Sequence, residues 1–69
     1  MKTFNANGKN PNELHDYLIA NDCAPLYLGN NAVYGDDGEI VQEATEIYIM
    51  VEEGKEDKLT QLVDQFMSK

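Results

Sequence analysis

The stretch Thr45-Glu46-Ile47-Tyr48-Ile49-Met50-Val51-Glu52 decides the fold of this chain, because it is the clearest strand in the sequence. Successive side chains of a strand point to opposite faces of a sheet, so positions 45, 47, 49 and 51 share one face, and all four are β-branched. The other face carries Tyr48 and Met50 between two glutamates and is therefore only half polar. This pattern predicts a central strand, or a strand whose outer face is covered, for example by another subunit.

A hairpin is expected directly before this strand. Residues 35–38 read Gly-Asp-Asp-Gly, and these residue types tolerate the positive φ angles of tight turns. Residues 32–34 and 39–42 would form the two strands of the hairpin. Earlier in the chain, the apolar residues 25–28 are followed by Gly-Asn-Asn at 29–31, which predicts a strand that ends in a turn.

Two helices are predicted on either side of these strands, and residues 2–4 form a further short strand. The first helix should cover roughly residues 11–22, because Asn10 can cap it, Pro11 suits its first position, and apolar residues recur at 14, 17 and 18. The second follows Gly54 and has acids in its first turn. Its apolar residues fall on one side, which we expect to pack on the sheet: Leu59, Leu62, Val63, Phe66 and Met67.

Residues 1–69 are expected to form a single small acidic domain of the α+β class. The predicted architecture is a small, mainly antiparallel sheet of three to four strands with two helices packed on it, in the order β-α-β-β-β-α. In so short a chain, apolar burial barely exceeds an ordering entropy of about 1.5 kcal/mol per residue, which leaves oligomerisation open as a source of stability. No apolar run reaches the length of a signal peptide or a membrane span, so we expect a cytoplasmic protein that does not enter membranes.

The sequence offers little material for catalysis, and we expect no enzymatic activity and no cofactor. His15 is the only imidazole and lies beside the apolar stripe of the first helix, while Ser68 lies near the end of the chain. Cys23 has no disulfide partner and no basic neighbour in sequence to activate its thiol, so we expect a small buried hydrophobe. The acids at 36–39 lack the ligand spacing of an EF-hand loop, so no metal site is predicted.

Negative charge is concentrated in one third of the chain. Thirteen Asp and Glu oppose five Lys and no Arg, which gives a net charge of -8. Residues 36–57 contain nine of these acids and the single base Lys55, whereas residues 1–35 sum to -1 and residues 58–69 to +1. Net negative charge disfavours direct binding to nucleic acid or to an anionic bilayer. The concentrated acids are Asp36, Asp37, Glu39, Glu43, Glu46, Glu52, Glu53, Glu56 and Asp57.

Three explanations of this acidic segment stay open. The acids can simply keep a small protein soluble. They can form a negative surface that docks on a basic partner, because carboxylates on one face of a strand are about 6.8 Å apart, a spacing comparable to that of backbone phosphates. Since the acids occupy both odd and even positions, a bulge near Glu43-Ala44 or a dimer would have to gather them. Finally, the chain can be a small structural or assembly subunit that binds a partner, or itself, through the apolar face of Tyr48 and Met50.

In its acid concentration between Asp36 and Asp57, its lack of Arg and its short length, the chain resembles the small acidic proteins with which bacteriophages take over host functions, the DNA-mimic inhibitors. Those proteins share a composition rather than a fold or a motif. The resemblance implies a non-enzymatic inhibitor that occupies the DNA-binding surface of a basic nucleic-acid-binding protein, and a homodimer is one form it could take. The residues expected to bind the partner are the nine concentrated acids, with Tyr34 and Tyr48 as anchors.

Overall fold

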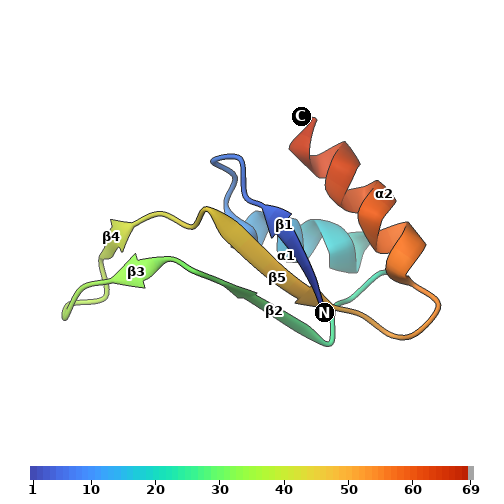
Figure 1. The fold of residues 1–69 in the computed structure, drawn as a ribbon, viewed down its shortest axis with the longest axis horizontal. Coiled ribbons are helices and arrows are strands. Elements are labelled where there is room, and N and C mark those ends of the chain that lie inside the picture. Colours follow the sequence, from blue (N-terminus) through green and yellow to red (C-terminus); the bar gives the residue numbers. More distant parts are fainter. Residues whose placement is uncertain (69) are drawn as a thin grey trace.

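The central sheet has three strands, with β5 (Glu46–Met50) in the middle. The computed structural model describes residues 1–68, and in it β5 pairs antiparallel with β1 (Lys2–Asn5) on one side and β2 (Tyr27–Asn30) on the other (Figure 1). The prediction of a central strand within residues 45–52 is confirmed. The strand at the N-terminus, expected at residues 2–4, is confirmed as well.

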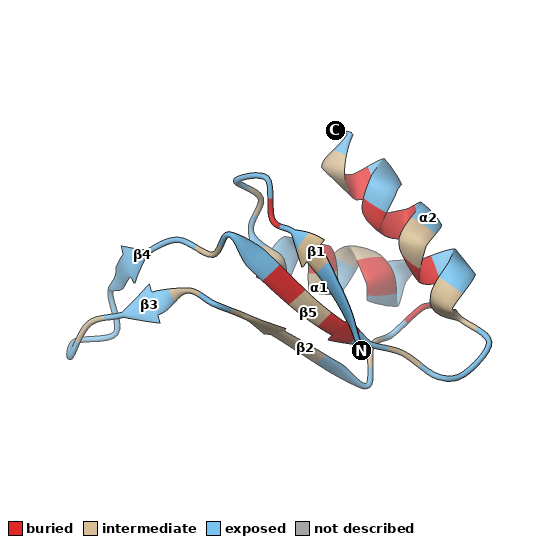
Figure 2. Ribbon diagram, viewed as in Figure 1, coloured by how far each residue is buried: buried red, intermediate tan, exposed pale blue. Residues whose placement is uncertain are grey.

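Both helices pack on one face of this sheet. Ile47 and Ile49 of β5 are buried in one core with residues of α1 (Pro11–Ala20) and α2 (Glu56–Met67), as the alternation along the strand predicts (Figure 2). Burying one such side chain fully is worth about 1.5–3 kcal/mol. The α+β class and the succession of strand, helix, strands and helix agree with the sequence-based expectation; the observed order, β1-α1-β2-β3-β4-β5-α2, has one more strand between the helices.

The start of α1 follows the signals that predicted it. The side chain of Asn10 accepts a hydrogen bond from the backbone N–H of Asn12 at 2.8 Å, and Pro11 occupies the first helical position. The helix ends at Ala20, slightly before the expected end near residue 22, because the backbone becomes left-handed at Asp22 (φ 57°).

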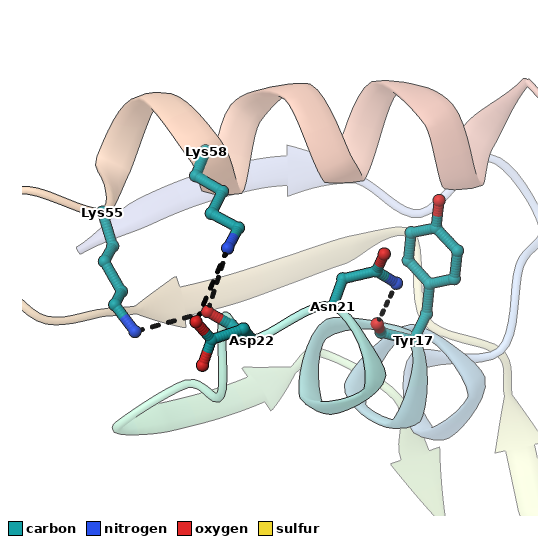
Figure 3. A network of polar contacts seen from close by, with 5 residues as sticks. All are labelled: Tyr17, Asn21, Asp22, Lys55 and Lys58. Atoms are coloured by element: carbon teal, nitrogen blue, oxygen red, sulfur yellow. Dashed lines mark hydrogen bonds and ion pairs between the residues drawn. The ribbon is translucent and has the colours of Figure 1, made fainter.

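The apolar stripe of α2 faces the core as predicted. The ring centroid of Phe66 lies 5.6 Å from that of Tyr17 in α1, which joins the two helices. Near the start of α2, the amines of Lys55 and Lys58 each donate a hydrogen bond at 3.3 Å to the backbone carbonyl of Asp22, just beyond α1 (Figure 3). The two helices are thus connected at both ends of α2. Its buried residues are Leu59, Leu62, Val63 and Phe66, and Met67 is partly buried.

A separate two-stranded hairpin extends from the sheet. β3 (Val33–Tyr34) pairs antiparallel with β4 (Ile40–Gln42), and the pair projects beyond β2 and β5 at one end of a molecule that is 39 Å long (Figure 1). We call residues 31–45 the arm. None of the buried core residues belongs to the arm. The position of the arm therefore depends on local contacts and not on core packing.

The turn predicted at residues 29–31 is wrong. Gly29 and Asn30 are part of β2, where they lie opposite Tyr48 and Ile47 of the central strand. The ladder with β5 supplies hydrogen-bonding partners for this segment, so the tertiary pairing overrides the turn preference of Gly and Asn. The chain continues from β2 into the arm instead of reversing.

The hairpin also contains a bulge. Val33 lies opposite Gln42, whereas Tyr34 lies opposite Ile40, so Val41 is the extra residue. This bulge is closer to the turn than Glu43-Ala44, the position at which a bulge would gather the acids on one face. Residues 43–45 are an irregular connection between β4 and β5.

Candidate functional site

The tip of the arm is a tight turn whose shape is fixed by local hydrogen bonds. The N–H of Gly35 donates to the carbonyl of Glu39 at 2.7 Å, and the N–H of Glu39 donates to Oδ1 of Asp37 at 3.1 Å. Gly38 has a φ of 86°, a left-handed conformation that glycine adopts without steric cost. The sequence Gly-Asp-Asp-Gly thus forms the turn that its residue types predict.

Carboxylates line the arm from this tip to its base. All of them are exposed, and no Lys or Arg occurs between residues 10 and 54 to neutralise them. The arm itself therefore contributes only negative charge, and its field extends into solvent over about a Debye length. The acids of the arm are Asp36, Asp37, Glu39 and Glu43, and Glu46 follows at its base as the first residue of β5.

Apolar side chains occupy the same arm and are unusually exposed. The exposed fractions are 47% for Val33, 59% for Tyr34, 57% for Ile40 and 70% for Val41. Scattered apolar residues are normal on a protein surface, but a group of large ones on a single projecting element is typical of an interaction site. The arm therefore combines charge, which attracts a partner over distance, with apolar area, which supplies contact energy.

Asn31 connects the arm to the sheet. Its Oδ1 accepts hydrogen bonds from the N–H of Thr45 at 2.9 Å and the N–H of Glu46 at 3.0 Å, and its Nδ2 donates to Oγ1 of Thr45 at 2.9 Å. Next to it, Oδ1 of Asn30 accepts from the N–H of Ala32 at 2.9 Å. These bonds join the segment after β2 to the segment before β5, at the point where the β2–β5 ladder ends. They fix the direction in which the arm leaves the sheet.

The other predicted acids lie far from the arm. Glu52, Glu53, Glu56 and Asp57 surround the turn at Gly54, which is at the opposite end of β5 and of the molecule (Figure 1). Glu56 also has a local role, because both of its carboxylate oxygens accept from the N–H of Gly54, at 3.1 and 3.3 Å. The nine acids that the sequence grouped together thus form two separate sets.

Tyr48, the second predicted anchor, lies on the sheet face that the helices leave uncovered. Its hydroxyl donates a hydrogen bond to Oε2 of Glu46 at 3.2 Å. Partial burial, this hydrogen bond and the negative charge of Glu46 raise the pKa of Tyr48, with a further contribution from Tyr27. Tyr27 and Met50 continue the same face, with exposed fractions of 50% and 39%. Tyr34 and Tyr48 therefore belong to two different surfaces.

A groove that the sequence did not predict separates the arm from the start of α1. It has a volume of about 160 Å³, and it is lined by residues 8–12 on one side and by residues of the arm, including Tyr34 and Ile40, on the other. The two walls are far apart in sequence. The pairing of Asn5 with Glu46 and the hydrogen bond from the N–H of Ala6 to the carbonyl of Thr45 at 2.8 Å bring them to the same end of the molecule, so no local sequence signal marked the groove.

The residues considered for catalysis do not gather at any of these surfaces. Cys23 is fully buried in the core, as expected for a small hydrophobe, and Nδ1 of His15 lies 3.7 Å from a carboxylate oxygen of the neighbouring Asp16. Within residues 1–68, no polar or charged residue is buried, and no group of three His, Cys, Asp or Glu is placed to hold a metal ion.

Neither helix among the described residues combines the length and the apolar character that crossing a bilayer requires. Comparisons with protein-family models, with curated proteins and with solved structures find no match for this chain. The candidate site therefore has to be judged on its own geometry and charge.

Proposed function

We propose that this chain is a non-enzymatic, acidic protein-binding module whose arm docks on the DNA-binding surface of a basic nucleic-acid-binding protein. It would then act as a DNA-mimic inhibitor of the kind that phages use in host takeover, in the cytoplasm, where DNA-binding proteins are found. The observation that carries the proposal is the arm itself: four exposed carboxylates and four exposed apolar side chains lie on one projecting ribbon, with the carboxylate of Glu46 at its base.

Charge supports this choice of partner. A surface with uncompensated carboxylates attracts a basic protein over long range and repels an acidic one, and this attraction speeds up encounter. DNA-binding surfaces are rich in Lys and Arg that neutralise phosphates. Carboxylates spaced along a ribbon can replace those phosphates, so binding of the arm and binding of DNA would exclude each other.

Apolar contacts would determine how long the complex lasts. Interfaces obtain most of their binding energy from a few desolvated apolar or aromatic anchors, while rim charges mainly affect the association rate. Tyr34 and Ile40 lie within the same hairpin as Asp36, Asp37 and Glu39. The arm can therefore provide both contributions through one element.

A second candidate function follows from the uncovered face of the sheet. Tyr27, Tyr48 and Met50 are adjacent there, because Tyr27 pairs with Met50 and Gly29 pairs with Tyr48. In this alternative the chain is an assembly subunit that binds a partner, or a second copy, through this face. Such binding would depend little on salt, whereas binding through the arm would weaken strongly as salt screens the charges.

The test compares two charge-reversed variants in affinity capture from bacterial lysate at low salt and at about 0.5 M salt, where the Debye length is only a few ångströms. The arm variant carries Asp36→Lys, Asp37→Lys and Glu39→Lys. The control variant carries Glu52→Lys, Glu53→Lys and Asp57→Lys, which changes the net charge equally at the other end of the molecule.

We expect the unmodified protein and the control variant to retain a basic nucleic-acid-binding protein that duplex DNA displaces and high salt releases. The arm variant should fold and should lose this partner. Equal loss in both variants would show that only net charge matters, and retention that survives salt would favour the sheet face instead.

A further inference from the structure

The groove beside the arm has the size of a receptor for one side chain. Its volume is about 160 Å³. A protein cavity of roughly 150 Å³ holds a benzene molecule, whereas sites for cofactors and drug-sized ligands start at about 300 Å³. The groove can therefore take an aromatic ring or a branched aliphatic group, and it is too small for a nucleotide.

The groove has an apolar wall and a polar wall. Ala32, Tyr34 and Ile40 line it on the arm, with Ala44 at its base, whereas Lys9, Asn10 and Asn12 line it beside the start of α1. The ionisable lining residues are one Lys and one Glu, at positions 9 and 43, so the lining has no excess charge. An aromatic ring or a branched aliphatic group can pack on the apolar wall of the arm, where its buried area supplies contact energy.

The carboxylates of the arm lie close to the groove along the chain. Glu43 lines it, and the turn between Tyr34 and Ile40 carries Asp36, Asp37 and Glu39. We call these four carboxylates the acidic rim. A segment that places an apolar side chain in the groove therefore lies within their negative field. Cationic residues next to the apolar one would be stabilised by them.

We infer that the groove receives one aromatic or branched aliphatic side chain from a basic segment of the partner protein, with flanking Lys or Arg on the acidic rim. This inference rests on the proposed function and specifies how the arm holds its partner. A second copy of this chain is a poor occupant, because each copy has a net charge of -8 and no Arg. Charge alone would not distinguish one basic segment from another. The groove would select those segments that carry an aromatic or branched aliphatic residue.

The test uses three capped pentapeptides and the full chain, with binding followed by amide chemical shifts in two-dimensional NMR. The probes are Lys-Lys-Phe-Lys-Lys, the same peptide with Ala in the centre, and Glu-Glu-Phe-Glu-Glu. We expect the Phe peptide to shift the amides of Gly8, Ala32 and Ala44 and to bind at least about fivefold tighter than the Ala peptide, since its ring becomes buried. The acidic peptide should produce no shifts.

Two matched variants locate the effect. Ile40→Ala removes apolar area from the groove and should abolish the preference for Phe over Ala. Val33→Ala removes a similarly exposed side chain of the same arm that does not line the groove, and it should keep the preference. Both sites are exposed, so neither change should unfold the protein.

Equal affinities for the Phe and Ala peptides, shifts outside the groove, or no shifts with any peptide would each overturn the inference. The proposed function is judged separately by DNA-competed capture and by the arm variant with reversed charges. A positive capture result with equal peptide affinities would mean that the arm binds its partner without using the groove.

Discussion

The side chain of Asn31 bonds to two backbone N–H groups and one hydroxyl across the base of the arm. An amide is suited to this position because it is both an acceptor and a donor. Its bonds replace those of the β2–β5 ladder at the point where the two strands separate. Nothing in the sequence Gly-Asn-Asn-Ala distinguishes this role from that of an ordinary turn residue. For this reason, the sequence predicted a turn here and gave no indication that Asn31 connects the arm to the sheet.

Replacing Asn31 with Ala should loosen the arm more than it destabilises the fold. The bonds are exposed, so water partly replaces them, and we expect the free energy of unfolding to fall by about 1 kcal/mol in urea titrations. The amides of Thr45 and Glu46 should exchange with solvent markedly faster. Asn31→Asp keeps the acceptor oxygen and should protect these two amides; fast exchange in that variant would contradict the role assigned to the side chain.

Tyr48 gives a second prediction at this scale, from the direction of its pKa. The phenol should titrate above its ordinary value of 10.0, and Glu46→Gln should bring the pKa down, since the variant removes the nearby negative charge. Because the pKa is raised in the folded state, the associated stability is fully present below pH 10 and is lost as the pH rises through the raised pKa. Ultraviolet absorbance titration of both proteins, with Tyr27→Phe to simplify assignment, measures this difference.

At the scale of elements, the end of α1 is a Schellman motif with an unfavourable residue in its left-handed position. The N–H of Cys23 bonds to the carbonyl of Leu18 at 2.9 Å, and the N–H of Asp22 bonds to that of Ile19 at 3.3 Å. Asp22 has a φ of 57°, where glycine is normally preferred. Its carboxylate also lies at the negative end of the helix, although Lys58 is 3.9 Å away.

Asp22→Gly should therefore stabilise the protein, by up to about 1 kcal/mol, because the relief of strain and of the dipole interaction exceeds the loss of an exposed ion pair. Thermal unfolding measures the effect as a higher midpoint. Asp22→Asn is the control: it removes the charge, keeps the side chain and should give a smaller increase. A lower midpoint for the glycine variant would mean that the pair with Lys58 matters more than the backbone.

Elements with strong local signals were predictable from the sequence. The alternation along residues 46–50, the cap at Asn10 and the apolar stripe of α2 each match what the structure contains. Where pairing with a distant strand decides the outcome, local signals failed. Gly29 became part of β2 and the bulge formed at Val41, because the β2–β5 ladder and the register of the hairpin are set by contacts that no local pattern contains.

For the molecule as a whole, the core and the arm are separable. Among residues 1–68, ten form the buried core, and all of them lie in the sheet, the helices or the segments directly attached to these. Deleting residues 32–45 and joining Asn31 to Glu46 through an Asn-Gly turn should therefore leave a folded protein, since this dipeptide suits a two-residue hairpin between paired strands. The N–H of Asn31 already bonds to the carbonyl of Glu46, which sets the register for such a turn.

Circular dichroism and thermal unfolding should show unchanged helix content and cooperative unfolding for this deletion. Capture of a basic partner should be lost, because the deletion removes Asp36, Asp37, Glu39 and Glu43 together with the exposed apolar residues. An unfolded product would instead assign the arm to the folding unit, and partner capture by a folded product would exclude the arm as the binding element.

The distribution of the candidate site over the molecule was only partly predictable. The sequence identified the acidic residues. It did not show that β5 separates them into two sets, one at the arm and the other around the turn at Gly54, at opposite ends of a molecule that is 39 Å long. It also grouped Tyr34 with Tyr48, although one lies on the arm and the other on the sheet. Three-dimensional position decides which charges act together, and composition does not contain it.

The independence of the arm from the core has a consequence for how such a protein can change over generations. Substitutions at exposed positions of the arm that do not shape its turn remove no core contact, so they can accumulate under selection for a new target while the scaffold of sheet and helices drifts slowly. Under the proposed function, one ancestral scaffold would in this way supply ribbons that recognise different basic proteins. Descendants would then share a fold with almost no recognisable similarity in the segment that matters most.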